Sequence, residues 1–226
     1  MGAKKKATGR GRQLGLTRLQ IIQAGIDYAD ANGTEKLSMR QLASTLGCGV
    51  MSLYNHVADK DDLIDGMVDQ VANEIDLPTR KGTLKNWHAD LRGCLISAYK
   101  MMLNHRWVAK YWSRGMGPAK NAYHETILRI MRQAGFSEEL TCRGYHALTM
   151  HVVGFALQVI DLPFRNNTEL RAMATQVLEE LEAGPYPYLL EHAHFHLDGR
   201  DKRNDFKYML DLILEGLHRD RLLDEG

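Results

Sequence analysis

Residues 38–57 read SMRQLASTLGCGVMSLYNHV, and this stretch decides the fold of the N-terminal region. Its apolar spacing predicts a helix from residue 38 to about residue 46, a tight turn at 47–49 and a second, short helix over 50–57. Two glycines in the turn allow the helices to cross at a steep angle, as in a helix-turn-helix. The alternative is a plain helical hairpin with a mixed polar face.

The outward side of the second predicted helix carries no carboxylate. The side chains there are Met51, Ser52, Tyr54, Asn55 and His56. Small polar groups can meet base edges, whereas hydroxyl and imidazole groups can meet phosphates. Lys60 follows at the start of the next predicted helix, where its ammonium can reach a DNA backbone beside the positive helix end.

The flanking segments also favour helices. Thr17 followed by Gln20 is a capping-box pattern that opens a predicted helix over 17–31, and Asp59 can cap a further helix. Beyond Pro78, periodic apolar residues predict longer helices over 83–104, 119–134, 137–162, 168–182 and 204–222. No alternating β-branched run is visible. The sequence therefore predicts an all-α chain, with a small three-helix head that contains the helix-turn-helix and a larger helical C-terminal domain.

Charge is distributed unevenly along the chain. Residues 1–60 contain nine Lys or Arg and four Asp or Glu, a net charge of +5, whereas residues 61–226 have a net charge of −4. A basic end on a mildly acidic body suits a protein that touches a polyanion with one end only. The leading basic residues are Lys4, Lys5, Lys6, Arg10, Arg12 and Arg18. They form either an arm that adds phosphate or minor-groove contacts or a solubilising leader.

Cysteine content and apolar runs indicate a cytoplasmic protein. The three cysteines, Cys48, Cys94 and Cys142, are far apart and match neither a disulfide framework nor a zinc finger. No apolar stretch follows the basic N-terminus, so we expect no secretory signal. The longest apolar run, 150–160, is interrupted by polar residues and glycine, so we expect no membrane span.

The region from Thr17 to about Val71 resembles the DNA-binding head of the tetracycline-repressor (TetR/AcrR) family. The matching segments are Ala31-Asn32-Gly33, Leu37 to Ala43, Leu46-Gly47, Leu53 to Val57 and Lys60 to Leu63. The resemblance covers about a quarter of the chain and is carried by the ordered combination rather than by any one motif. It implies an operator-binding protein whose second short helix is the recognition helix.

The resemblance also implies roles for single residues of the head. Arg40 matches an arginine that reaches a base or a phosphate, and Ser52 matches the small hydroxyl residue of the recognition helix. Phosphate contacts are implied for Tyr54, His56 and Lys60. Asn55 falls at a variable position that helps to set operator preference.

In this family the last long helices form a twofold interface, so the resemblance implies a homodimer. Such a dimer can place two recognition helices about 34 Å apart, in successive major grooves of a palindromic site. The candidate interface residues lie on the predicted helices over 137–162 and 204–222 and are Phe155, Val159, Phe206, Met209, Leu210, Ile213, Leu214 and Leu217. Ordinary intrachain core takes up part of both helices.

The region between the head and these helices is rich in Met, aromatic and His residues, which suit an adaptable apolar cavity for a small-molecule effector. The candidate lining residues are Trp87, Met101, His105, Trp112, Met116, Tyr123, Ile127, Met131, His146, Met150 and His151. Most residues of this kind are core, and about a third would line a cavity.

His192, His194 and His196 invite a metal hypothesis, because histidine is a common ligand of zinc, copper or nickel. Their alternating spacing suits an extended segment and fits no standard zinc spacing. We therefore expect a solvated loop, with no metal and no cofactor.

The working hypothesis is a homodimeric repressor that is released from its operator by a small apolar or amphipathic effector. It divides the chain into a basic arm (1–16), a DNA-binding domain (17–76) and an effector-binding and dimerisation domain (83–223). The alternatives are an activator or effector-independent regulator of the same fold, a helical interaction protein, and an all-helical His-dependent metalloenzyme. No nucleophile with partners and no repeated Glu-x-x-His pair supports an enzyme.

Overall fold

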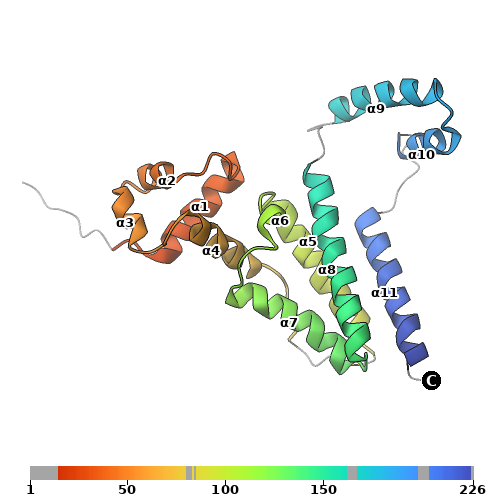
Figure 1. Cartoon of the computed structure of the whole chain (residues 1–226), viewed down its shortest axis with the longest axis horizontal. Helices are drawn as coiled ribbons and strands as arrows, with labels where there is room; N and C mark the ends of the chain where they lie inside the picture. The colour runs from red at the N-terminus through yellow and green to blue at the C-terminus, as the bar shows by residue number, and fades with distance from the viewer. Residues whose placement is uncertain (1–14, 80–82, 84, 162–166, 198–203, 225–226) are drawn as a thin grey trace, which may run out of the picture. The chain divides into compact units, whose positions relative to one another are not determined.

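The computed structural model describes residues 15–79, 83, 85–161, 167–197 and 204–224. These residues form helices and contain no strand (Figure 1). The helices are α1 (Arg18–Asn32), α2 (Met39–Thr45), α3 (Val50–Tyr54), α4 (Lys60–Ala72), α5 (Trp87–Asn104), α6 (Val108–Tyr111), α7 (Pro118–Gln133), α8 (Glu138–Ile160), α9 (Asn167–Glu182), α10 (Pro187–Leu197) and α11 (Asp205–Asp224). The predicted all-α class is confirmed. The predicted arm over 1–16 lies almost wholly outside the described residues.

The chain divides into two compact units. Unit 1 combines the chain up to Glu74 with Asn104–Tyr123, and unit 2 combines Ile75–Leu103 with the chain from His124 onward. The short helix α6 and the first turns of α7 therefore cluster with α1–α4. The chain passes from unit 1 to unit 2 after Glu74, returns to unit 1 at Asn104 and leaves it again after Tyr123. The break expected between the domains 17–76 and 83–223 lies close to the first of these three points. The functions expected for the two domains, DNA binding for one and effector binding and dimerisation for the other, remain predictions, as do their limits.

Local capping explains where the head helices begin. The side chain of Thr17 accepts a hydrogen bond from the Gln20 amide, and the Gln20 side chain reaches back to the Thr17 amide, which completes the predicted capping box. Ser38 caps α2 through the third amide of that helix. Asp59 caps α4 in the same way.

The core of unit 1 forms where α1 packs on α4 and α2 packs on α3. Leu42 and Ala43 on α2 and Leu53 on α3 are buried, as the apolar spacing of the helix-turn-helix predicts. Gly47 makes the turn between α2 and α3 with a φ of +64°, a backbone conformation that side chains with a Cβ rarely adopt.

One arginine ties α1 to the start of α4. Arg18 donates to both carboxylate oxygens of Asp62, at 2.9 and 2.7 Å, and to the carbonyl oxygen of His56 at 2.7 Å. Asp62 also accepts from the Ala58 amide at 2.8 Å. Arg18 was grouped with the leading basic residues in the sequence. The structure instead gives its charge a partner within the head.

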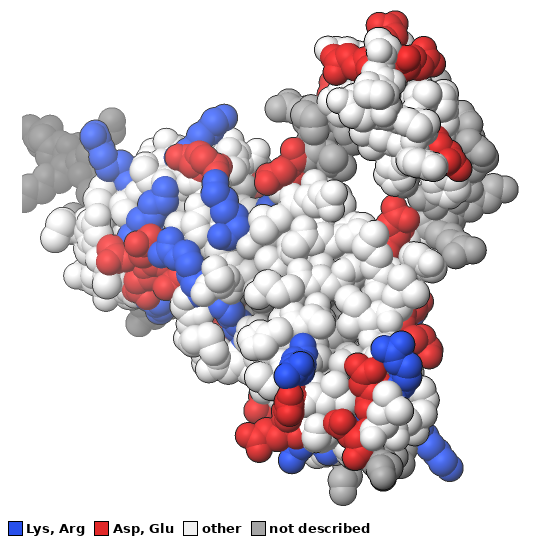
Figure 2. Space-filling view, turned by 45° about the vertical axis from the view of Figure 1, so that its right-hand side comes forward, with Lys and Arg blue, Asp and Glu red and all other residues white. Residues whose placement is uncertain are grey.

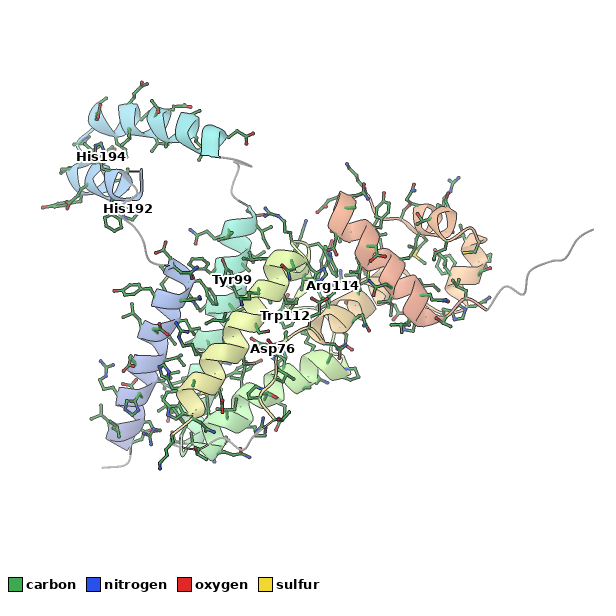
Figure 3. All side chains as sticks on the ribbon, turned by 180° about the vertical axis from the view of Figure 1, so that it is seen from behind. Asp76, Tyr99, Trp112, Arg114, His192 and His194 are labelled. Atoms are coloured by element: carbon green, nitrogen blue, oxygen red, sulfur yellow. The ribbon has the colours of Figure 1, made fainter. Side chains whose placement is uncertain are left out.

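The core of unit 2 includes the contact between α8 and α11. At the start of α11 the ring of Phe206 stacks on Tyr99 of α5, with centroids 3.9 Å apart, and on His151 of α8, with centroids 4.7 Å apart. His151 also places Nε2 2.9 Å from the Phe206 carbonyl oxygen. Figure 3 labels Tyr99 on α5. These rings fix the beginning of α11 against two other helices.

We predict that Arg18→Ala lowers the free energy of unfolding by about 1 kcal/mol at neutral pH, because a two-pronged ion pair and a further hydrogen bond are lost from partly exposed groups. The hydrogen bond from Arg18 is the main cause that holds the pKa of Asp62 below its usual 3.8. The pair therefore contributes fully above about pH 4, and this contribution disappears as the pH falls through the lowered pKa of Asp62. Urea unfolding of both proteins at pH 7 and pH 3 should show the difference shrinking in acid.

Arg143→Ala is the matched control for this prediction. Arg143 pairs with Glu139 one helical turn away on α8, and both side chains are about three-quarters exposed. Its removal should cost less than about 0.5 kcal/mol. Equal losses from the two substitutions would contradict a special role for Arg18.

Candidate functional site

The candidate recognition helix α3 is held by its buried side. Leu53 is 0% exposed, and Val57 just beyond the helix is also buried. The helix ends at Tyr54 rather than continuing to Val57, and the His56 amide closes a tighter turn onto the Leu53 carbonyl. The predicted helix over 50–57 is therefore one turn too long, because the chain must bend there to enter the cap of α4.

The opposite side of α3 faces solvent. Met51 is 74% exposed, Tyr54 and Asn55 are also exposed, and Ser52 and His56 are half-buried. A groove of about 780 Å³ runs between this region and α1. It is lined by Gly15, Leu16, Gln20, Gln23, Ala24, Asp27, Leu46, Cys48, Ser52, Asn55 and His56. Three of the predicted DNA-contacting side chains thus share one surface hollow.

The two predicted cationic contacts differ in their surroundings. Arg40 is exposed on α2. Lys60 is half-buried, and its ammonium donates to the carbonyl oxygen of Thr34 at 3.2 Å. One of its three donors is therefore used inside unit 1. Figure 2 shows basic and acidic side chains side by side on the visible face of unit 1.

The candidate effector-lining residues belong to both units and differ in burial. Met116, His146 and Met150 are exposed. Those buried in unit 2 are Trp87, Met101, Ile127 and Met131, and those buried in unit 1 are Trp112 and Tyr123. His151 is half-buried in the ring cluster around Phe206. Their role in ligand binding stays a prediction.

His105 is engaged on both ring nitrogens within unit 1. Its Nδ1 lies 2.9 Å from a carboxylate oxygen of Asp30, and its Nε2 lies 3.1 Å from Glu74. The indole of Trp107 donates to Asp30 at 2.7 Å. His105 thus joins the end of α1 to the segment just after α4, and its expected contact with an effector stays a prediction.

Unit 2 has a hollow of about 270 Å³ that contains none of the predicted lining residues. It lies beside Cys94 and Asp76, the latter labelled in Figure 3. Burial is the main cause that raises the pKa of the Cys94 thiol to about 12, so this cysteine stays protonated and unreactive at neutral pH.

Four of the predicted interface residues belong to the intrachain core. Phe206, Leu210, Leu214 and Leu217 are buried without any partner, because this stripe of α11 faces the chain's own helices. These four residues serve the intrachain core, which was expected to take up part of this helix, and their part in a dimer interface stays a prediction. Phe155, Val159 and Ile213 are half-buried, and Met209 is exposed. The sequence reasoning missed the second apolar stripe of α11, whose exposed members include Tyr208 and Leu212.

The histidine cluster lies on a helix and not in a loop. His192 and His194 are on α10, which begins at Pro187, a residue favoured in the first turn (Figure 3). The expected loop is therefore wrong. No group of three or more His, Cys, Asp or Glu among the described residues could hold a metal ion. Within the same residues, no helix combines the length and apolar character needed to cross a membrane.

A helix-turn-helix with a solvent-facing second helix, joined to a larger all-helical unit, defines the class of helix-turn-helix transcriptional regulators. The comparisons agree. The family model of the tetracyclin repressor-like C-terminal domain matches residues 81–221. The chain therefore belongs to the tetracycline-repressor family. It is a transcriptional repressor with a C-terminal domain of the ligand-binding type, and not an enzyme.

Similar proteins span nearly the whole chain. An HTH-type transcriptional regulator of Saccharopolyspora erythraea is 28% identical over 204 residues, 89% of this chain and 84% of that protein. The HTH-type transcriptional repressor DrrR1 of Streptomyces coeruleorubidus is 30% identical over 219 residues, 92% of this chain and 79% of that protein.

A similar solved structure is apo ActR from Streptomyces coelicolor, with a TM-score of 0.79 at 28% identity over 92% of this chain and 98% of that chain. ActR in complex with actinorhodin has a TM-score of 0.75 at the same identity, over 93% and 97% of the two chains.

Proposed function

We propose that this repressor binds a palindromic operator as a homodimer and leaves it when a small apolar or amphipathic molecule binds the C-terminal domain. The observation that carries the proposal is the two-sided character of α3. Leu53 anchors the helix, and the exposed Met51, Tyr54 and Asn55 are left to meet DNA. Phosphate contacts position such a helix, and contacts to base edges select the sequence. The site of action is the cytoplasm, where the DNA lies.

Exposed apolar residues on α8 and α11 support the dimer. On α11, Met209 and Leu212 are exposed, and Gly216 lies one turn further along the same face. On α8, Met150 and Gly154 are exposed. A Cβ on either glycine would meet nothing within 4 Å, so the surface is open to a second helix. Two such faces related by a twofold axis would form a four-helix interface.

The effector proposal rests on the C-terminal domain type and on a relative. ActR, which is 28% identical, has been solved in complex with actinorhodin. The apolar side chains of α5 and α7, such as Met101, Ile127 and Met131, suit a ligand of mixed apolar and polar character. A ligand that favours a second state of the dimer by about 1–3 kcal/mol would change operator affinity by roughly 5–150-fold.

We predict that Lys60→Gln weakens binding to all duplexes alike, because it removes one phosphate contact. The slope of log affinity against log salt concentration should become shallower by about 0.9. The glutamine amide keeps an uncharged hydrogen-bond donor at this position. The measurement is fluorescence anisotropy on genomic fragments selected by the wild-type protein. Lys100→Gln, an exposed change on α5, is the control. An unchanged slope for Lys60→Gln would reject the phosphate contact.

We also predict that Leu212→Glu dissociates the dimer. Leu212 is 56% exposed in the single chain, and a carboxylate buried there without a partner costs several kcal/mol. The dimer dissociation constant should rise at least about a hundredfold, measured by light scattering during size exclusion. Lys207→Glu makes a charge change at an exposed position on the other side of α11 and should leave the dimer intact. A Leu212→Glu protein that remains dimeric would remove this face from the interface.

A further inference from the structure

Helix α7 begins without a capping side chain of its own. Gly117 stands at the position before the helix, and its carbonyl accepts from the Asn121 amide. Pro118 follows and has no amide hydrogen. The amide of Lys120, the third residue of the helix, still needs a hydrogen-bond acceptor. The side chain of a capping residue normally supplies this acceptor.

Asp69 of α4 supplies that acceptor. Its Oδ1 accepts from the Lys120 amide at 3.0 Å, although the two residues are 51 positions apart in the chain. A Cβ added to Gly117 would overlap the carboxyl group of Asp69. The glycine thus leaves the space in which the carboxylate of another helix acts as the N-cap of α7. The negative charge also suits the positive end of the helix.

The side chain of Lys120 reinforces the joint. It is 3% exposed, and its ammonium donates to the carbonyl oxygens of Arg114 and Gly115 at 2.6 and 2.7 Å. Burial, the largest influence, lowers its pKa, while the charges of Asp65 and Asp69 on α4 oppose that shift. The first turn of α7 is therefore held to α4 by a cap and by charge.

Neighbouring contacts extend the same attachment. Arg114 pairs with Asp61 at 2.9 Å, one helical turn before Asp65 on α4. The Lys120 ammonium lies 5.5 Å from the ring centre of Trp112, a cation–π distance. Figure 3 labels Trp112 and Arg114. Every residue of this network belongs to unit 1, whereas α7 itself continues beyond Tyr123 into the residues of unit 2.

We propose that Asp69 is the positioning residue that couples α4 to α7, so that a displacement of α7 is passed to the DNA-binding head. The inference rests on the proposed function. Residues expected to sense the effector, Ile127 and Met131, lie further along α7, and α4 packs directly on α1 of the head. Because binding equilibria are reciprocal, DNA bound by the head must then change the stability of the first turn of α7.

Hydrogen exchange of the full-length protein, read by mass spectrometry, tests the joint in the absence of DNA. Asp69→Ala should speed exchange in peptides covering 118–124 by about twofold to thirtyfold, the range for a lost N-cap. Asp69→Asn should restore most of the protection, since an amide oxygen also caps helices. Glu139→Gln removes the exposed ion pair with Arg143 on α8, outside this network, and should leave these peptides unchanged. Equal exchange in Asp69→Ala and wild type would overturn the trans cap.

The double variant Asp69→Ala/Gly117→Ser separates coupling from capping. The serine can cap α7 from its own position, so peptides 118–124 should regain protection while the link through Asp69 to α4 stays broken. The DNA probe is a genomic duplex that the wild-type protein selects. It should slow exchange of 118–124 in wild type and in Asp69→Asn, and have no effect there in the double variant.

The outcomes distinguish the two proposals. A DNA-dependent change that persists in the double variant, or is missing from a wild-type protein that binds the duplex, would overturn the coupling role of Asp69. If no duplex is selected at all, the proposed function fails. The exchange measured without DNA would still decide whether Asp69 holds α7.

Discussion

The burial of Leu53 is the contact on which the DNA-facing surface depends. A helix of five residues such as α3 has no stability of its own in water. It exists because one side chain inserts into the core of unit 1 and because Gly47 turns the chain to bring it there. Met51 and Tyr54 of α3 remain exposed and take no part in the core. Because Leu53 anchors α3, the exposed side chains of this helix have a fixed orientation, which the readout of base edges requires.

Local signals made much of the fold predictable. Each of three helices in unit 1 begins at a residue whose side chain accepts from the amide three residues further on, namely Thr17, Ser38 and Asp59. The sequence next to each capping residue is therefore sufficient to predict where that helix begins. The two helices that the sequence analysis did not predict, α6 and α10, have no such capping pattern. Helix α6 has four residues, too few for a periodic pattern. Helix α10 carries alternating histidines that resemble an extended segment, although Pro187 marks its first turn.

The candidate sites were less predictable, because contacts with residues far apart in the sequence determine which side of a helix is buried and which residues form pairs. Helix α11 has apolar residues on two sides, and the pattern alone does not say which side the chain keeps for its own core. Leu214 and Leu212 look equivalent in sequence but are buried and exposed, respectively. The carboxylate that Arg18 binds lies 44 residues away, and the carboxylate that accepts from the Lys120 amide lies 51 residues away. Basic residues near a DNA-binding motif therefore include some that serve the fold.

Pairing of its acidic residues explains why the head can bind DNA although α4 is acidic. Five carboxylates lie along and just beyond α4 and would repel a phosphate backbone if they stood free, and four of them illustrate how this charge is paired. Each has a partner within unit 1, and the pairs are Asp61 with Arg114, Asp62 with Arg18, Asp69 with the Lys120 amide, and Glu74 with His105. The same contacts attach α4 to its neighbours. The pairs thus neutralise carboxylates that would otherwise repel DNA, and they also hold α4 against its neighbours. The same contacts therefore serve both the charge balance and the rigidity of the head.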